Sequence, residues 1–206
     1  MAQRKSGFER QPLERYETRE PWIVAALGEH LPLKGLSVWE PAAGTGKLAG
    51  LLEAAGATVW SSDIEPAGTQ RSRLEGVDFL DATWCPEVDM ICTNPPFGGQ
   101  GRLAVGFIEA GLRWLRAPRG PRLLALLLSV DFDSASTRVA LFRDCEEFSA
   151  KIVLLRRIRW FDGPSGPSTN HAWFVFRRAE LGSQIPRLLY GPTATNTETA
   201  VELDSL

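Results

Sequence analysis

The chain has 206 residues, of which 44% are hydrophobic and 23% charged, so it can bury one large core and is not globally disordered. Its formal net charge of −2 carries no overall nucleic-acid signature, although a localised basic face is compatible with that value. One large domain is the expected organisation.

Neither a membrane segment nor a metal site is expected from the sequence. The first ten residues are polar and charged, unlike a signal peptide, and the longest apolar run, residues 123–130, is too short to cross a bilayer. The three cysteines, Cys85, Cys92 and Cys145, form no CxxC pair and do not cluster with a histidine. We therefore expect a cytoplasmic protein without a structural metal or a disulfide framework.

The first half of the chain alternates helix and strand patterns. We expect a flexible N-terminus over residues 1–12, followed by a helix over 22–27 that has Pro21 in its first turn. A strand at 36–39, a helix over 47–55 and a strand at 57–62 come next. A short third strand then precedes Asp78 and Phe79.

The second half continues this alternation and ends differently. A strand at 89–93, a helix over 103–115, an apolar strand at 123–129 and a helical segment at 136–142 are followed by strands at 151–160 and 172–177. This order predicts an α/β fold with a parallel sheet, and the last two strands predict an antiparallel hairpin. We assign the domain to residues 13–181 and a polar, disordered tail to 182–206, with no separate target recognition domain.

Glycines follow the first predicted strand, where a ligand can approach the backbone. Gly44 and Gly46 precede a helix, but the segment lacks the third glycine of a dinucleotide fingerprint, and Leu48 after Lys47 excludes the usual phosphate loop. Glu40, just before the turn, would repel a pyrophosphate. It suits a ligand that carries an ammonium group.

Acidic residues follow the next two strands. Asp63 can accept hydrogen bonds from both hydroxyls of a ribose, and its alternative role is to cap a helix. Asp78 can bind the amino group of an adenine while Phe79 stacks on the ring. The alternative is a solvated aspartate beside a core phenylalanine, and Asp81 competes for the same role as Asp78.

The sharpest motif is Asn94-Pro95-Pro96-Phe97 at the end of a buried strand. Two prolines fix φ, so the carbonyl of Pro95 and the side-chain oxygen of Asn94 can form a pair of acceptors. Such a pair suits an exocyclic amino group, and Phe97 offers a stacking face for a planar substrate. A tight turn with an Asn cap is the alternative interpretation.

In this order, the motifs resemble those of S-adenosylmethionine-dependent amino-methyltransferases of the class I fold, most closely the N6-adenine DNA methyltransferases. The resemblance covers about residues 16–176 and implies a Rossmann-like, mostly parallel seven-stranded sheet with helices on both faces. It implies S-adenosylmethionine as cofactor and no metal. The implied cofactor-binding residues are Tyr16, Thr18, Glu40, Ala42, Gly44, Gly46, Asp63, Ile64, Asp78 and Phe79, and the implied catalytic residues are Asn94, Pro95, Pro96 and Phe97. In the N-terminal motif, Thr18-Arg19-Glu20-Pro21 replaces the family's Thr-Pro.

The C-terminal hairpin is basic and aromatic, which points to substrate contacts. Residues 151–178 hold six Lys and Arg residues and one acid. The alternative is a charged edge strand that prevents aggregation. The loop at 162–171 is expected to form one wall of the pocket that binds the target. His171, at its end, is a candidate catalytic base. The candidate substrate-binding residues are Arg156, Arg157, Arg159, Trp160 and His171.

The predicted function is methylation of an exocyclic amino nitrogen, and the favoured substrate is adenine N6 in DNA. Methylation of RNA adenine or of a protein glutamine amide uses the same four-residue turn. A non-catalytic nucleic-acid or partner-binding protein on the same fold is an alternative of another class. The expected partners are DNA and either a second copy of the chain or a specificity subunit.

Overall fold

The computed structural model describes residues 16–65, 74–160, 169–179 and 186–192. Its α-helices are α1 (Pro21–Gly28), α2 (Lys47–Ala54) and α3 (Arg102–Arg116). Of the short 3-10 helices, η2 (Gly99–Gly101) directly precedes α3, and η3 (Phe132–Ser134) and η4 (Ser136–Leu141) lie between β5 and β6. Its strands are β1 (Ser37–Glu40), β2 (Thr58–Asp63), β3 (Leu74–Glu75), β4 (Met90–Thr93), β5 (Leu123–Ser129), β6 (Phe148–Val153), β7 (His171–Arg177) and β8 (Arg187–Tyr190).

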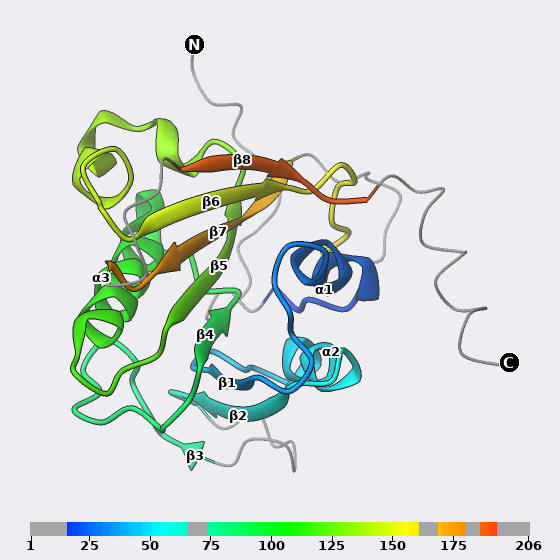
Figure 1. The fold of residues 1–206 in the computed structure, drawn as a ribbon, viewed down its shortest axis with the longest axis vertical. Helices are drawn as coiled ribbons and strands as arrows, with labels where there is room; N and C mark the ends of the chain where they lie inside the picture. Colours follow the sequence, from blue (N-terminus) through cyan, green and yellow to red (C-terminus); the bar gives the residue numbers. More distant parts are fainter. Residues whose placement is uncertain (1–15, 66–73, 161–168, 180–185, 193–206) are drawn as a thin grey trace, which may run out of the picture.

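The strands form one mixed sheet in the order β3-β2-β1-β4-β5-β7-β6-β8 (Figure 1). The strands from β3 to β5 are all parallel, whereas β7 runs antiparallel to both β5 and β6. This confirms the predicted α/β class, with a mostly parallel sheet and a C-terminal antiparallel hairpin.

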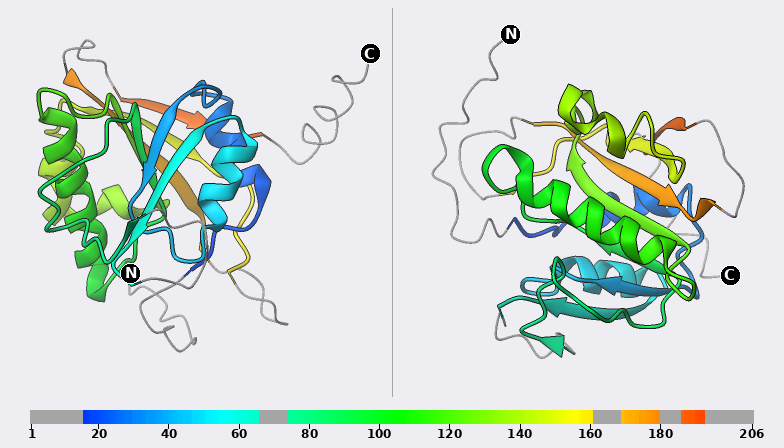
Figure 2. Two further views of the ribbon diagram at one scale, coloured as in Figure 1. Left: turned by 90° about the horizontal axis from the view of Figure 1, so that it is seen from below. Right: turned by 90° about the vertical axis from the view of Figure 1, so that its left-hand side faces the viewer.

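Helices cover both faces of the sheet, as predicted. α1 and α2 pack on one face, and α3 packs on the other (Figures 1 and 2). β5 shows why its sequence is almost continuously apolar: Leu124, Leu126 and Leu128 face the α3 side, while Ala125 and Leu127 face the α1 side. Since both faces are covered, each residue in this part of β5 is buried, and no polar alternation is possible.

The eighth strand, β8, was not predicted. It lies within residues 182–206, which the sequence indicated as a polar tail, and it pairs in parallel with β6. Leu188 and Tyr190 are 58% and 54% exposed, so the segment lacks the alternation of buried residues that marks a strand. A tertiary contact holds its end, because His30 Nε2 lies 2.9 Å from the carbonyl oxygen of Tyr190.

The predicted strand over 151–160 ends earlier, at Val153. The chain bends at Leu155 and Arg156, beyond the last pairing of β6 with β7. Arg156, Arg157 and Arg159 therefore follow the strand instead of lying on it. Their position contradicts the interpretation as charges on an edge strand, because β8 occupies that side of β6.

The described ranges hold neither a membrane-spanning helix nor a cluster of metal ligands. No helix in them has the length and apolar character needed to cross a membrane. Within the same ranges, no group of three or more His, Cys, Asp or Glu side chains is placed to hold a metal ion.

Candidate cofactor and active site

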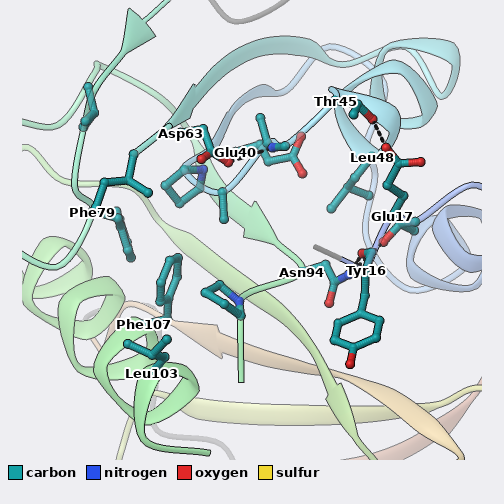
Figure 3. A pocket seen from close by; sticks show the side chains of 18 of the residues that line it. Tyr16, Glu17, Glu40, Thr45, Leu48, Asp63, Phe79, Asn94, Leu103 and Phe107 are labelled. Carbon is teal, nitrogen blue, oxygen red and sulfur yellow. Dashed lines mark hydrogen bonds between the residues drawn. The ribbon is translucent and has the colours of Figure 1, made fainter. Parts of the chain in front are cut away.

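A cavity of about 370 Å³ lies at the carboxyl ends of β1, β2 and β4, where open α/β sheets bind ligands (Figure 3). The N-terminal segment 16–18, the loop after β1 and one end of α3 complete its walls. Of the predicted cofactor residues, Gly46 alone does not line the cavity, and the others do so: Tyr16, Thr18, Glu40, Ala42, Gly44, Asp63, Ile64, Asp78 and Phe79. From the catalytic motif, Asn94 and Pro96 line it.

The loop after β1 is tied to the end of β2. The Gly44 N–H donates to Asp63 Oδ2 at 2.8 Å, and the Ala43 N–H donates to the Ser62 carbonyl at 3.0 Å. Asp63 Oδ1 accepts the Glu65 N–H at 3.0 Å. Asp63 therefore organises this loop while it faces the cavity. Gly46 supports the loop from outside, as the residue that caps the start of α2.

Glu40 is the most unusual polar group of the cavity wall. It is 2% exposed, and its Oε2 has no hydrogen-bond partner within the described part of the chain. Burial raises the pKa of Glu40 well above its usual range, and the negative charge of Asp63 adds to this effect. A buried carboxylate oxygen without a partner is costly, so a cationic donor supplied by a ligand would compensate for the cost.

The part of the cavity wall formed by Ile64, Asp78 and Phe79 combines polar and apolar groups. Asp78 Oδ1 accepts the Leu80 N–H at 2.9 Å and lines the cavity, whereas Asp81 is exposed and does not line it. Phe79 is 2% exposed, since its ring packs against Trp39, yet it also contributes to the wall. Ile64 lines the cavity although it is 55% exposed, and it offers an apolar surface to a flat ring.

On the β4 side, the orientation of Asn94 is fixed by the N-terminal segment. Asn94 Nδ2 donates to the Tyr16 carbonyl at 2.7 Å and lies 3.3 Å from Thr18 Oγ1 (Figure 3). With Nδ2 engaged in this way, Oδ1 remains as the acceptor of the side chain. Thr18 is 2% exposed, so its hydroxyl is held within the structure.

The same N-terminal segment also reaches the loop after β1. The Thr45 hydroxyl donates to Glu17 Oε1, and this hydrogen bond is the largest cause of a lowered pKa for Glu17. Residues 16–18 thus connect the two sides of the cavity: Glu17 holds the glycine loop, and its two neighbours hold Asn94.

Phe97, which the sequence predicted to stack on the substrate, does not line this cavity. Its ring packs edge-on against Phe132 at a centroid distance of 6.2 Å, and its carbonyl accepts the N–H groups of Leu103 and Ala104. Pro95 also does not line the cavity, whereas Pro96 does. The structure therefore gives Phe97 a role in holding the turn against the start of α3.

The candidate substrate residues of the hairpin lie outside the cavity wall. The Arg156 guanidinium stacks over Trp22 at 5.1 Å, Arg157 Nε donates to Asn170 Oδ1 at 2.9 Å, and the Arg159 N–H lies 3.4 Å from Glu20 Oε2. These contacts place Arg156 and Arg159 at the start of α1, whereas Arg157 contacts the residue that precedes β7. The predicted wall formed by residues 162–171 lies mostly outside the described residues.

Trp160 and His171 lie next to each other and reach the site through Tyr16. The ring of Trp160 contacts Tyr16 at 5.8 Å and His171 at 5.1 Å. His171 is 5% exposed, and burial lowers its pKa to about 4. Its imidazole is therefore neutral at pH 7, and with so low a pKa it is a weak base.

Several wall residues were missed from the sequence. Leu103 and Phe107 lie four residues apart on α3 and face the cavity, and the helical period could have placed them on one face of the helix. Thr45, Lys47 and Leu48 also line it, within the glycine loop and the first turn of α2. Gly98 of the glycine-rich loop after the catalytic motif also lines the cavity, and Val77 and Leu80 contribute to the wall without a signal in the sequence.

Comparisons with known proteins support the fold. No protein-family profile and no curated protein matches the chain. Among solved structures, it is similar to a candidate RNA methyltransferase from Pyrococcus horikoshii, with 16% identity and a TM-score of 0.60 over 85% of this chain and 93% of that one. It is also similar to a candidate class I S-adenosylmethionine-dependent methyltransferase from Listeria monocytogenes, with 15% identity and a TM-score of 0.57 over 88% of this chain and 65% of that one.

A third similar structure belongs to a larger assembly. It is the modification subunit of a candidate type I restriction enzyme from Vibrio vulnificus, with 15% identity and a TM-score of 0.56 over 79% of this chain and 44% of that one. The chain therefore spans less than two thirds of the Listeria and Vibrio proteins. At these identities the likeness establishes the fold, which is that of the class I methyltransferases.

Proposed function

We propose that the chain is an S-adenosylmethionine-dependent methyltransferase that acts on an exocyclic amino nitrogen, adenine N6 in DNA before other substrates. The observation that carries this proposal is the composition of one cavity. It has a buried carboxylate with one unpartnered oxygen, Glu40 Oε2, on one side and an oriented amide, Asn94, on the other. These two groups match the ammonium of the methyl donor and the amino group of the acceptor.

The β1 and β2 side fits the cofactor. Glu40 would accept from the ammonium, Asp63 from the ribose hydroxyls and Asp78 from the adenine amino group, with Ile64 and Phe79 against the ring. When bound, S-adenosylmethionine supplies a methyl group that its positively charged sulfur has already activated. The protein then needs to place and orient the two reactants more than it needs a strong base.

The β4 side fits an amino acceptor. The Asn94 Oδ1 acceptor and the Pro95 carbonyl would each take one hydrogen of the amino group and leave the nitrogen lone pair directed at the methyl group. Adenine N6 in a duplex is out of reach of such a site, so the base would have to flip out of the helix. The basic residues Arg156, Arg157 and Arg159 would contact the phosphate backbone.

Adenine in RNA is the second candidate substrate. The Pyrococcus protein, of which this chain spans 93%, is described as an RNA methyltransferase, whereas the Vibrio protein belongs to a restriction enzyme. A glutamine amide has the same two-hydrogen nitrogen and is a third candidate. We favour DNA on the resemblance of the ordered motifs, with sequence specificity supplied by a second copy of the chain or a partner subunit.

Transfer of a labelled methyl group tests the proposal. The purified chain is incubated with labelled S-adenosylmethionine and, separately, with DNA, RNA and protein extracts; Asn94→Ala is the inactive variant and Asp81→Ala the matched control at an exposed acid outside the cavity. We expect label in adenine N6 of DNA, lost in Asn94→Ala and retained in Asp81→Ala. Label found only in RNA or only in protein would contradict DNA as the substrate and leave the methyltransferase proposal standing. If no extract gains label that depends on Asn94, the proposal that the chain is a methyltransferase is wrong.

A further inference from the structure

The turn that follows the catalytic motif contains an unusual backbone. In Gly98-Gly99-Gln100-Gly101, the φ angles of Gly98, Gln100 and Gly101 are 68°, 59° and 78°. Among the described residues, Gln100 alone combines a β carbon with a positive φ. Left-handed backbone is unfavourable for such a residue, and it persists where the surrounding structure determines it, often at functional sites.

Neighbouring side chains hold this turn in place. A β carbon at Gly98 would come within 2.7 Å of the Leu103 side chain, and one at Gly101 within 2.7 Å of Arg138 Nη2. Arg138 Nη2 donates to the Gln100 carbonyl at 3.1 Å. The peptide of Gln100 is therefore fixed by packing on both sides and by a hydrogen bond from η4.

The same arginine connects the turn to the catalytic motif. Arg138 Nη1 donates to the Phe132 carbonyl at 2.7 Å, and the guanidinium lies 3.7 Å above the Phe132 ring. That ring in turn packs against Phe97 of the catalytic turn. Arg138 therefore links Gln100, through Phe132, to Phe97 at the end of the catalytic motif.

The side chain of Gln100 makes no contribution of its own to this arrangement. Gln100 is exposed, and its amide makes no hydrogen bond to any other residue in the described ranges. A glycine would take the same φ without steric cost, as at the two glycines beside it. The amide carries a donor and an acceptor side by side, which matches the edge of a nucleobase.

We propose that Gln100 is a specificity-determining residue that reads the base next to the target adenine. Gly98, two residues before Gln100, lines the same cavity as Asn94, so Gln100 belongs to the turn that leads away from the cavity wall, beside the path that a flanking nucleotide would take under this proposal. The proposal rests on the proposed methylation of DNA, and Arg138 serves as a positioning residue for Gln100.

The test measures which adenines are methylated in a DNA library with random bases around a single adenine. The wild-type chain is compared with Gln100→Gly, which removes both the amide and the backbone strain, and Gln100→Ala, which removes only the amide. We expect a preference for one flanking base in the wild type, reduced roughly tenfold or more in both variants. S-adenosylmethionine affinity should stay unchanged, and the melting temperature of Gln100→Gly should not fall.

Three results would overturn the inference. A flanking-base profile that is equal in the wild type and both variants, or a wild type without any preference, would contradict the reading role while the methyltransferase proposal stands. A drop in the melting temperature of Gln100→Gly that accounts for its lost activity would make Gln100 a structural residue. A wild type that methylates no adenine in DNA would overturn the proposed function, and the role of Gln100 with it.

Discussion

The two sides of the cavity are held by different kinds of contact. On the β1 and β2 side, the loop 41–46 is tied by backbone and carboxylate hydrogen bonds to the neighbouring strand, as in Gly44 to Asp63. On the β4 side, Asn94 is oriented by Tyr16 and Thr18, which lie 78 and 76 residues earlier in the chain.

The two sides therefore depend on the N-terminal segment to different degrees. The cofactor loop is held mainly by the adjacent strand β2. The side chain of Asn94 is held by the N-terminal segment. Glu17 couples the two, since it accepts a hydrogen bond from Thr45 in the cofactor loop. Substitutions on the two sides should therefore separate cofactor binding from methyl transfer.

The largest effect is expected at Asn94. Asn94→Ala removes the acceptor aimed at the substrate amino group, so kcat should fall by about 10²–10³-fold. S-adenosylmethionine affinity should fall far less, because Asn94 lies on the other side. Single-turnover kinetics with calorimetry would separate the two effects. Asn94→Asp keeps an acceptor but places a carboxylate beside the Tyr16 carbonyl, and activity equal to the wild type in that variant would contradict the orientation argument.

The next effect concerns Glu40. Glu40→Gln should weaken S-adenosylmethionine binding roughly ten- to hundredfold, since a hydrogen bond to a charged group contributes about 1.5–3 kcal/mol. Methyl transfer at saturating cofactor should change less than it does in Asn94→Ala. An equal loss of kcat in both variants would show that the two sides of the cavity are not separable.

The pH dependence of Glu40 has a definite sign. Below its ordinary pKa of 4.5 the carboxyl is neutral in the folded and the unfolded chain. As the pH rises from 4.5 through the raised pKa of the folded protein, the unfolded chain ionises first and the free protein loses stability. Cofactor affinity should rise over the same window, because the ammonium pairs with the ionised form. Calorimetry and thermal melts across this range should show both trends, and Glu40→Gln should lack them.

The cofactor side could be predicted from the sequence more completely than the acceptor side. Glu40, Asp63 and Asp78 were predicted to bind the cofactor because each lies at or just after the end of a strand, and the parallel order of the strands brings such positions together. Phe97 was assigned to stacking because its sequence neighbours suggested it, yet its ring packs on Phe132. No local signal marks a long-range contact of that kind.

Other features could not be predicted because residue type does not reveal them. The hydrogen bond from Asn94 to the Tyr16 carbonyl involves a backbone atom, which leaves no trace in residue identity. β8 was missed because its side chains are mostly exposed and its pairing with β6 is what defines it. The left-handed backbone at Gln100 gave no signal, because glutamine is not a residue type that favours it.

A smaller effect is expected at Thr18. Thr18→Val removes one partner of Asn94 Nδ2 and keeps the shape of the side chain, so kcat should fall by up to about tenfold, the equivalent of about 0.5–1.5 kcal/mol. KM for the cofactor should move less. Thr18→Ser restores the hydroxyl and should restore kcat, and a serine variant as slow as the valine variant would contradict the positioning role.

The smallest effect on catalysis is expected outside the cavity. Replacing Arg156, Arg157 and Arg159 together by Gln should leave cofactor affinity unchanged. It should reduce the slope of log affinity for DNA against log salt by about 0.9 for each phosphate contact that is lost. Filter-binding assays at several salt concentrations measure this slope. An unchanged slope would limit these arginines to their contacts within the chain, with Trp22, Asn170 and Glu20.

The most direct measurement compares two ligands on two proteins by calorimetry. S-adenosylmethionine carries the ammonium, whereas methylthioadenosine has the same adenine and ribose without the amino acid part. We expect Glu40→Gln to weaken the affinity for S-adenosylmethionine roughly ten- to hundredfold and to leave the affinity for methylthioadenosine unchanged. Equal affinities of the wild type and Glu40→Gln for S-adenosylmethionine, or equal losses for both ligands, would contradict the assignment of this cavity to the methyl donor.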